Sequence, residues 1–124
     1  MWKFKKIKNI KVEQFGRGCF IRANPDKKDI KLAAHGLQRV KEIILGEKFR
    51  LVILDEINIA IKLKLVSAQE VIDTLKGASR NIELVLTGRY ACPDILKLAD
   101  LVSEIKEKKH YYNIGVKARK GIEF

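Results

Sequence analysis

The sequence predicts an α/β protein with a parallel sheet flanked by helices, and three observations support this prediction. Short apolar runs alternate with segments whose apolar residues recur at helical spacing, which is typical of right-handed strand–helix–strand units. Residues 51–54 are apolar at every position, as expected for a strand covered on both faces in a parallel sheet. The 124 residues are 47% apolar and 33% charged, so we expect one folded domain over residues 1–124 rather than a disordered polycation.

Residues 1–50 predict a short strand followed by a long helix. Residues 9–15 alternate weakly between apolar and polar side chains, which indicates a strand that ends at Gly16. Asn24 then suits the N-cap of a helix, Pro25 suits its first position, and Gly46 suits its end. The apolar stripe of this helix consists of Ile30, Ala33, Leu37, Val40 and Ile44.

The remaining residues repeat the alternation of strands and helices. After the strand at residues 51–54, Ser67 and Glu70 have the spacing of a capping box, which predicts a helix from Ser67. Residues 82–86 form the next expected strand. Pro93 then begins a short helix that continues through Ala99, and residues 101–105 are the last expected strand.

The net charge of +11 is concentrated at the two ends of the sequence. Residues 1–50 carry a balance of +9, residues 51–105 carry −2, and residues 106–124 carry +4. Basic flanks can bind nucleic acid, a membrane surface or a polyphosphate, although lysine enrichment also serves solubility. The flanks lack the interleaved aromatic and basic residues of single-strand binders, so nucleic acid is the less favoured partner.

Several absences in the sequence point to a cytoplasmic protein. No stretch approaches the roughly 20 apolar residues of a membrane span, and no apolar segment of a secretory signal follows Met1. Cys19 and Cys92 lie far apart in sequence, and neither has a neighbour at metal-ligand spacing. We therefore expect no membrane insertion and no cysteine–histidine metal cage.

Charged and polar residues follow two of the expected strands where each one ends. Asp55-Glu56 follows residues 51–54, and Thr87-Gly88-Arg89 follows the next strand. Ligands of open parallel sheets bind outside the carboxyl ends of the strands. An aspartate after four buried apolar residues is also the Walker B pattern, in which it helps to hold Mg²⁺ beside nucleotide phosphates, and arginine binds phosphate bidentately.

Two points keep alternatives open at this edge. Acidic residues are also favourable at the start of a helix, which would explain Asp55 and Glu56 without any ligand. In addition, the 124 residues contain no G-x-x-x-x-G-K-[ST] loop, the element that cradles phosphates in nucleotide-binding proteins of this kind.

Longer stretches of the sequence resemble a known family. They are LVILDEIN at residues 51–58, LVLTGR at 84–89, ADLVSE at 99–104, Lys109-His110, and GVKARKGIEF at 115–124, with further similarity at residues 14–18 and in the helix from Pro25. In order and spacing these segments closely resemble the P-loop class of ATP:corrinoid adenosyltransferase, over essentially the whole chain. The resemblance implies a RecA-like P-loop NTPase-type parallel sheet. We expect it to be N-terminally shortened here, because the family's opening strand and phosphate loop would precede Met1.

The resemblance also implies a reaction and its participants. Family members bind ATP with Mg²⁺ and transfer the 5′-deoxyadenosyl group to the Co(I) of a reduced corrinoid, in cobalamin biosynthesis or salvage. Cobalt is the nucleophile, so the protein aligns the substrates and neutralises the leaving triphosphate. The family implies a homodimer, and a shortened sheet with exposed edges would also favour self-association.

Site residues carry over from the family by position. Asp55 and Glu56 would be the catalytic acidic residues, with Asp55 on the Mg²⁺ side, and Arg89 would face phosphate together with Thr87 and Gly88. Phe20 would cover part of the corrinoid, with an ordinary core position as its alternative. His110 would orient the C-terminal loop or contact ligand, unless it is a structural histidine.

Two other functions stay open from the sequence. The first is a non-catalytic protein that keeps a corrinoid-binding or partner-binding surface without a phosphate loop. The second is a RecA-like nucleic-acid-binding protein that uses the basic flanks.

Overall fold

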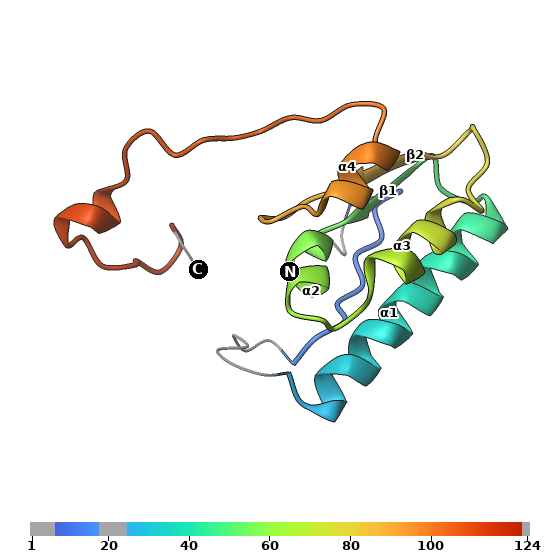
Figure 1. Ribbon diagram of the computed structural model, residues 1–124, viewed down its shortest axis with the longest axis horizontal. Helices are drawn as coiled ribbons and strands as arrows, with labels where there is room; N and C mark the ends of the chain where they lie inside the picture. Colours follow the sequence, from blue (N-terminus) through green and yellow to red (C-terminus); the bar gives the residue numbers. More distant parts are fainter. Residues whose placement is uncertain (1–6, 18–24, 123–124) are drawn as a thin grey trace.

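The computed structural model describes residues 7–17 and 25–122, which form helices packed against a small parallel sheet (Figure 1). The elements are, in chain order, α1 (Lys27–Gly46), β1 (Leu51–Leu54), α2 (Ile57–Lys62), α3 (Ala68–Leu75), β2 (Glu83–Leu86), α4 (Pro93–Leu98) and a 3-10 helix (Tyr111–Ile114). Helix α3 packs on both α1 and α4. None of the described helices is long and apolar enough to cross a membrane.

The sheet joins β1 and β2 in parallel, which confirms the predicted α/β class and the parallel pairing. Leu51 lies opposite Glu83 and Leu54 opposite Leu86, and the connection between the strands passes through α2 and α3. The described residues therefore form a mixed α/β fold with two paired strands.

The two faces of β1 differ in burial, which contradicts the prediction of a strand covered on both sides. Val52 and Leu54 are buried, whereas Leu51 and Ile53 are 52% and 56% exposed. Successive side chains of a strand point to opposite faces, and the described helices supply apolar side chains to only one of them. The core on that face contains, among the described residues, Ile44, Val52, Leu54, Val66, Val71, Leu75, Ile82 and Ile95.

Helix α1 begins at a capping box two residues later than the sequence suggested. Asp26, not Asn24, is the N-cap, and its carboxylate accepts hydrogen bonds from the backbone N–H groups of Lys28 and Asp29. Asp29 reciprocates by accepting from the N–H of Asp26, and this reciprocal pairing explains the position of the start. Asn24 lies outside the described residues. At the other end Gly46 is the last helical residue, while Glu47 takes the left-handed C-cap conformation.

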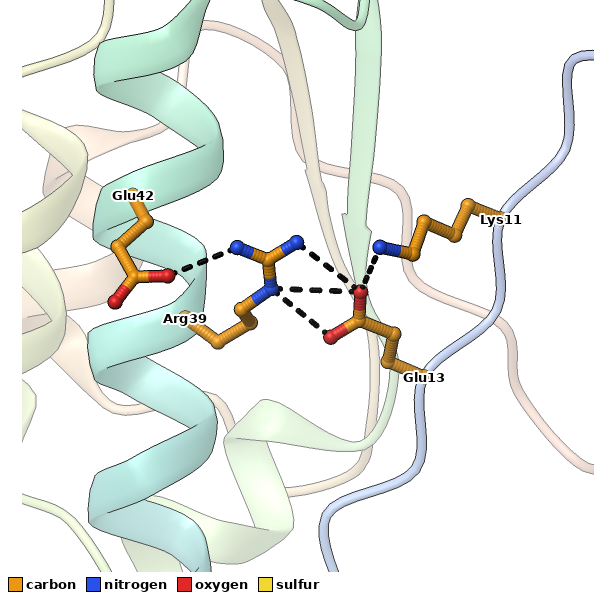
Figure 2. A network of polar contacts seen from close by, with 4 residues as sticks. All are labelled: Lys11, Glu13, Arg39 and Glu42. Atoms are coloured by element: carbon orange, nitrogen blue, oxygen red, sulfur yellow. Dashed lines mark hydrogen bonds and ion pairs between the residues drawn. The ribbon is translucent and has the colours of Figure 1, made fainter.

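The segment at residues 7–17 lies along α1 and is not a strand, so the strand prediction for residues 9–15 is wrong. Arg39 of α1 binds Glu13 (Nε to Oε2, 3.1 Å) and Glu42 (Nη1 to Oε2, 2.8 Å), and Lys11 also binds Glu13 (Figure 2). Lys11 and Arg39 hold the pKa of the Glu13 carboxyl below its ordinary value. Side-chain contacts, which are these ion pairs and the packing of Phe15 against His35 and Gly36, therefore attach this segment to α1 in place of a backbone ladder.

The end of the same segment is attached through Arg17. Its guanidinium binds the buried Asp29 carboxylate with two hydrogen bonds, Nε to Oδ1 at 2.8 Å and Nη2 to Oδ2 at 2.6 Å, and also pairs with Asp26. Hydrogen bonds from the backbone N–H groups of Asp29 and Lys28, together with Arg17, hold the pKa of Asp26 low. The capping residues of α1 are thus also the anchor of the preceding segment.

The strand predicted for residues 101–105 is absent as well. Leu101 and Ile105 are 84% and 98% exposed, and Figure 1 shows the chain leaving α4 and running away from the body before the 3-10 helix. A strand requires a backbone partner, and among residues 7–17 and 25–122 only β1 and β2 provide one to each other.

Candidate functional site

The carboxyl ends of β1 and β2 meet at one edge of the sheet. Because the strands are parallel and Leu54 pairs with Leu86, the residues after each strand emerge side by side. The backbone N–H of Thr87 donates to the carbonyl of Leu54 at 3.2 Å, so the ladder reaches the last position of the strands. The sequence prediction that these two segments share an edge is confirmed.

Thr87 links the two strand ends through its hydroxyl group. The hydroxyl donates to Oδ1 of Asp55 at 2.7 Å and accepts from the backbone N–H of Glu56 at 2.9 Å. One side chain therefore fixes both acidic residues relative to β2.

The backbone at this edge is unusual at three positions. Glu56 and Tyr90 have φ values of 59° and 66°, and Gly88 has a φ of 117°. A Cβ atom added to Gly88 would lie 3.2 Å from Oε2 of Glu56 and 3.3 Å from its Cα. Glycine is required here both by its conformation and by the close approach of the two segments, and such concentrations of backbone strain are typical of functional sites.

Asn58 is part of this edge although sequence reasoning did not single it out. It is 5% exposed, its backbone N–H donates to the carbonyl of Thr87 at 3.2 Å, and Nδ2 donates to the carbonyl of Gly88 at 3.4 Å. A polar residue inside the apolar run Ile57–Ile61 was the signal that could have identified it.

The charged side chains of the edge remain available to a ligand. Asp55, Glu56 and Arg89 are exposed. Within residues 7–17 and 25–122, the Arg89 guanidinium makes no hydrogen bond or ion pair. It follows Gly88 directly, in the segment that Thr87 ties to Asp55. Two carboxylates and a guanidinium thus occur at one strand edge, a combination suited to a metal-bound polyphosphate.

The donor set at this edge fits Mg²⁺ held jointly with a phosphate ligand rather than Mg²⁺ held by protein alone. In the described part of the chain, no three or more histidine, cysteine or acidic residues are grouped so that they could hold a metal ion. Mg²⁺ commonly takes one or two carboxylates and completes its shell with waters and substrate phosphates. Thr87 donates one hydrogen bond to Oδ1 of Asp55, so both oxygens of this carboxylate retain acceptor capacity for a cation.

Asp55 and Glu56 also stand directly before α2, so the alternative explanation from helix charge has a structural basis. Glu56 is the N-cap position of α2, but its side chain makes no capping hydrogen bond. The helix has six residues and no acidic residue in its first turn. Capping therefore does not account for the Glu56 side chain.

His110, another predicted site residue, is not brought to this edge. Nδ1 of His110 accepts from the N–H of Tyr112 at 3.0 Å and caps the 3-10 helix, in the segment that runs away from the body (Figure 1). Its ring lies 4.6 Å from that of Tyr111, centroid to centroid. Phe20 lies outside the described residues.

Comparison with known proteins places this chain in a family. Residues 2–124 match the family model described as ATP:corrinoid adenosyltransferase BtuR/CobO/CobP. The chain belongs to this family. The resemblance predicted from the sequence is thereby confirmed.

Named relatives are all longer than this chain. A corrinoid adenosyltransferase of a Sinorhizobium species is 36% identical over 88% of this chain and 51% of its own length. Those of Pseudomonas aeruginosa and Escherichia coli K12 are 31% and 33% identical, over 88% and 70% of this chain and 54% and 44% of their own lengths. The chain spans about half the length of these relatives.

Proposed function

We propose that this chain acts in the transfer of the 5′-deoxyadenosyl group from ATP to the Co(I) of a reduced corrinoid. Family membership supports this reaction. The observation that assigns it to particular residues is the hydrogen bond of 2.7 Å from the Thr87 hydroxyl to the Asp55 carboxylate, which links the ends of β1 and β2. We further propose that the sheet is part of a RecA-like P-loop NTPase-type fold, which the parallel β1–β2 pairing supports.

The proposed chemistry needs alignment and charge neutralisation more than proton transfer. Co(I) supplies the electron pair that forms the bond to the 5′ carbon of ATP, and the bond from that carbon to the triphosphate oxygen breaks as triphosphate leaves. Negative charge then develops on the leaving triphosphate, and preorganised cations stabilise it. Mg²⁺, when bound, would neutralise part of this charge.

Each residue of the edge has a role in this proposal. Asp55 and Glu56 would hold the Mg²⁺ side of the nucleotide, Arg89 would bind phosphate oxygens, and Thr87 and Gly88 would shape the segment that presents Arg89. The 124 residues contain no G-x-x-x-x-G-K-[ST] loop, so these are the phosphate-binding groups assigned within this chain.

Calorimetric titration of Mg-ATP into the chain tests this assignment. Asp55→Asn keeps the shape of the side chain but removes its charge, and we expect affinity to fall at least about tenfold. Asp100→Asn makes the same charge change at an exposed position outside the edge and should leave affinity within about twofold. Equal loss in both variants, or no binding by the unsubstituted chain, would contradict the proposal.

The guanidinium can be tested by the same titration. Arg89→Lys retains the charge but loses bidentate geometry, so we expect Mg-ATP affinity to weaken by about three- to tenfold. Arg80→Lys, at another exposed position, is the matched control. A spectroscopic assay for alkylation of cob(I)alamin then separates catalysis from binding. Corrinoid binding without an ATP-dependent change in the spectrum would favour the non-catalytic alternative.

We also propose that the chain self-associates through the uncovered face of its sheet. Leu51, Ile53 and Val85 are 52%, 56% and 40% exposed and lie on neighbouring strands. Sedimentation at micromolar concentration should detect an oligomer that Ile53→Lys weakens. Leu45→Lys, at an exposed apolar position on α1, should not weaken it. A monodisperse monomer would contradict this proposal.

A further inference from the structure

Asn58 is a buried amide whose position has no explanation in core packing. Asp29 and Asn58 are the buried polar or charged residues of the described part of the chain, and Arg17 compensates the charge of Asp29. The Oδ1 atom of Asn58 is buried without a hydrogen-bond partner among the described residues. An apolar side chain of similar shape would avoid this penalty.

What Asn58 contacts is the turn that carries Arg89. Its backbone N–H reaches the carbonyl of Thr87, and its Nδ2 reaches the next carbonyl along the chain, that of Gly88. A Cβ added to Gly88 would lie 3.3 Å from the Cβ of Asn58, so the side chain lies directly against this turn.

The orientation of the Gly88 carbonyl determines the orientation of the peptide unit from which Arg89 extends. This carbonyl and the nitrogen of Arg89 belong to one planar peptide unit, so a donor that holds the oxygen also orients the bond from which Arg89 extends. Gly88 has a φ of 117°, a region in which glycine retains broad freedom. An anchor on its carbonyl limits that freedom.

We propose that Asn58 is a positioning residue that holds the Gly88–Arg89 peptide against the end of β1 and thereby sets the approach of the Arg89 guanidinium to phosphate. The inference deepens the proposed function and rests on it for the identity of the ligand. The anchoring of the turn can be measured without any ligand.

A matched pair of substitutions separates the effect of the hydrogen-bond donor of Asn58 from the effect of its shape. Asn58→Val and Asn58→Thr introduce side chains of the same shape, but only threonine keeps a hydrogen-bond donor. The readout is amide hydrogen exchange at Glu56, whose N–H donates to the hydroxyl of Thr87 at 2.9 Å. We expect Asn58→Val to speed this exchange by about fivefold or more, and Asn58→Thr to speed it less.

The opposite end of the ladder provides the control for this measurement. The N–H of Glu83 donates to the carbonyl of Arg50 at 2.8 Å, and its exchange should stay within about twofold in both variants. Equal acceleration at Glu56 and Glu83, or equal effects of valine and threonine, would overturn the anchoring role. If Asn58→Val does not fold, Asn58→Leu, which roughly keeps the shape of Asn but has no hydrogen-bond donor, replaces it under the same criteria.

A double-mutant cycle tests the link to Arg89. In the Arg89 background we expect Asn58→Val to weaken Mg-ATP binding by about fivefold, and in the Arg89→Ala background by less than about twofold. Equal losses in the two backgrounds would show that Asn58 acts independently of Arg89 and would refute the positioning role. Failure of the unsubstituted chain to bind Mg-ATP would refute the proposed function instead, and the exchange rates would then decide whether Asn58 anchors the turn.

Discussion

Replacing Thr87 by valine removes one hydroxyl group from the strand edge while the shape of the side chain is preserved. The lost contacts are a hydrogen bond of 2.7 Å to the Asp55 carboxylate and one of 2.9 Å from the N–H of Glu56. A hydrogen bond to a charged group contributes about 1.5–3 kcal/mol and one between neutral groups about 1 kcal/mol. Water can replace both at this exposed edge, so we expect unfolding free energy to fall by about 1–2 kcal/mol.

Thermal and urea denaturation of the Thr87→Val variant measure this loss. For a chain of this length each kcal/mol corresponds to about 4 °C in Tm, so the shift should be about 4–8 °C. Thr74→Val is the matched control, because its hydroxyl makes a single hydrogen bond to the Glu70 carbonyl within α3 and valine there should cost less than about 0.5 kcal/mol. Equal destabilisation by the two variants would refute the conclusion that Thr87 holds the strand ends together.

Three further predictions concern the backbone of the edge, the core and a helix cap. Gly88→Ala places a Cβ 3.2 Å from Oε2 of Glu56 at a φ of 117°, so urea denaturation should show a loss of about 1–3 kcal/mol. Val71→Ala leaves a cavity at a fully buried position and should cost about 2–3 kcal/mol in the same assay, with a smaller loss refuting close packing there. Hydrogen bonds from the hydroxyl and backbone N–H of Ser67 lower the pKa of Glu70, so its contribution to stability is complete above the ordinary value of 4.5 and is lost as pH falls through the lower folded pKa. Glu70→Gln should therefore show a shallower loss of Tm below pH 4.5 than the unsubstituted chain, and parallel pH profiles would contradict this.

Elements with strong local signals were predictable from the sequence. The apolar run of β1, the Ser67–Glu70 capping box of α3 and the proline at the start of α4 each determine a boundary within a few residues. These features act through neighbours along the chain, so a reading of the sequence can detect them.

Elements that depend on distant partners were not predictable in the same way. The apolar patterns of residues 9–15 and 101–105 are compatible with strands, but a strand exists only where another strand offers its backbone. Conversely, Ile57–Lys62 alternates as a strand might, yet it forms α2 after the left-handed turn at Glu56 and a hydrogen bond from Asn58 to Thr87. Tertiary contacts decide all three segments.

In the candidate site, too, some residues were predictable from the sequence and one was not. The general rule for parallel sheets identified Asp55, Glu56, Thr87 and Gly88, because it requires only that two strands be adjacent and aligned. Asn58 belongs to a helix that the sequence did not predict, so its position beside Gly88 was inaccessible to that reasoning.

The parallel connection between β1 and β2 has a kinetic consequence. Asp55 and Thr87 are 32 positions apart, and they meet only after α2 and α3 have closed the crossover between the strands. Helices formed early during refolding would leave this hydrogen bond unmade. We therefore expect the Thr87–Asp55 contact to form only once the crossover has closed, and a molecule that binds there would favour chains in which the two strands are paired.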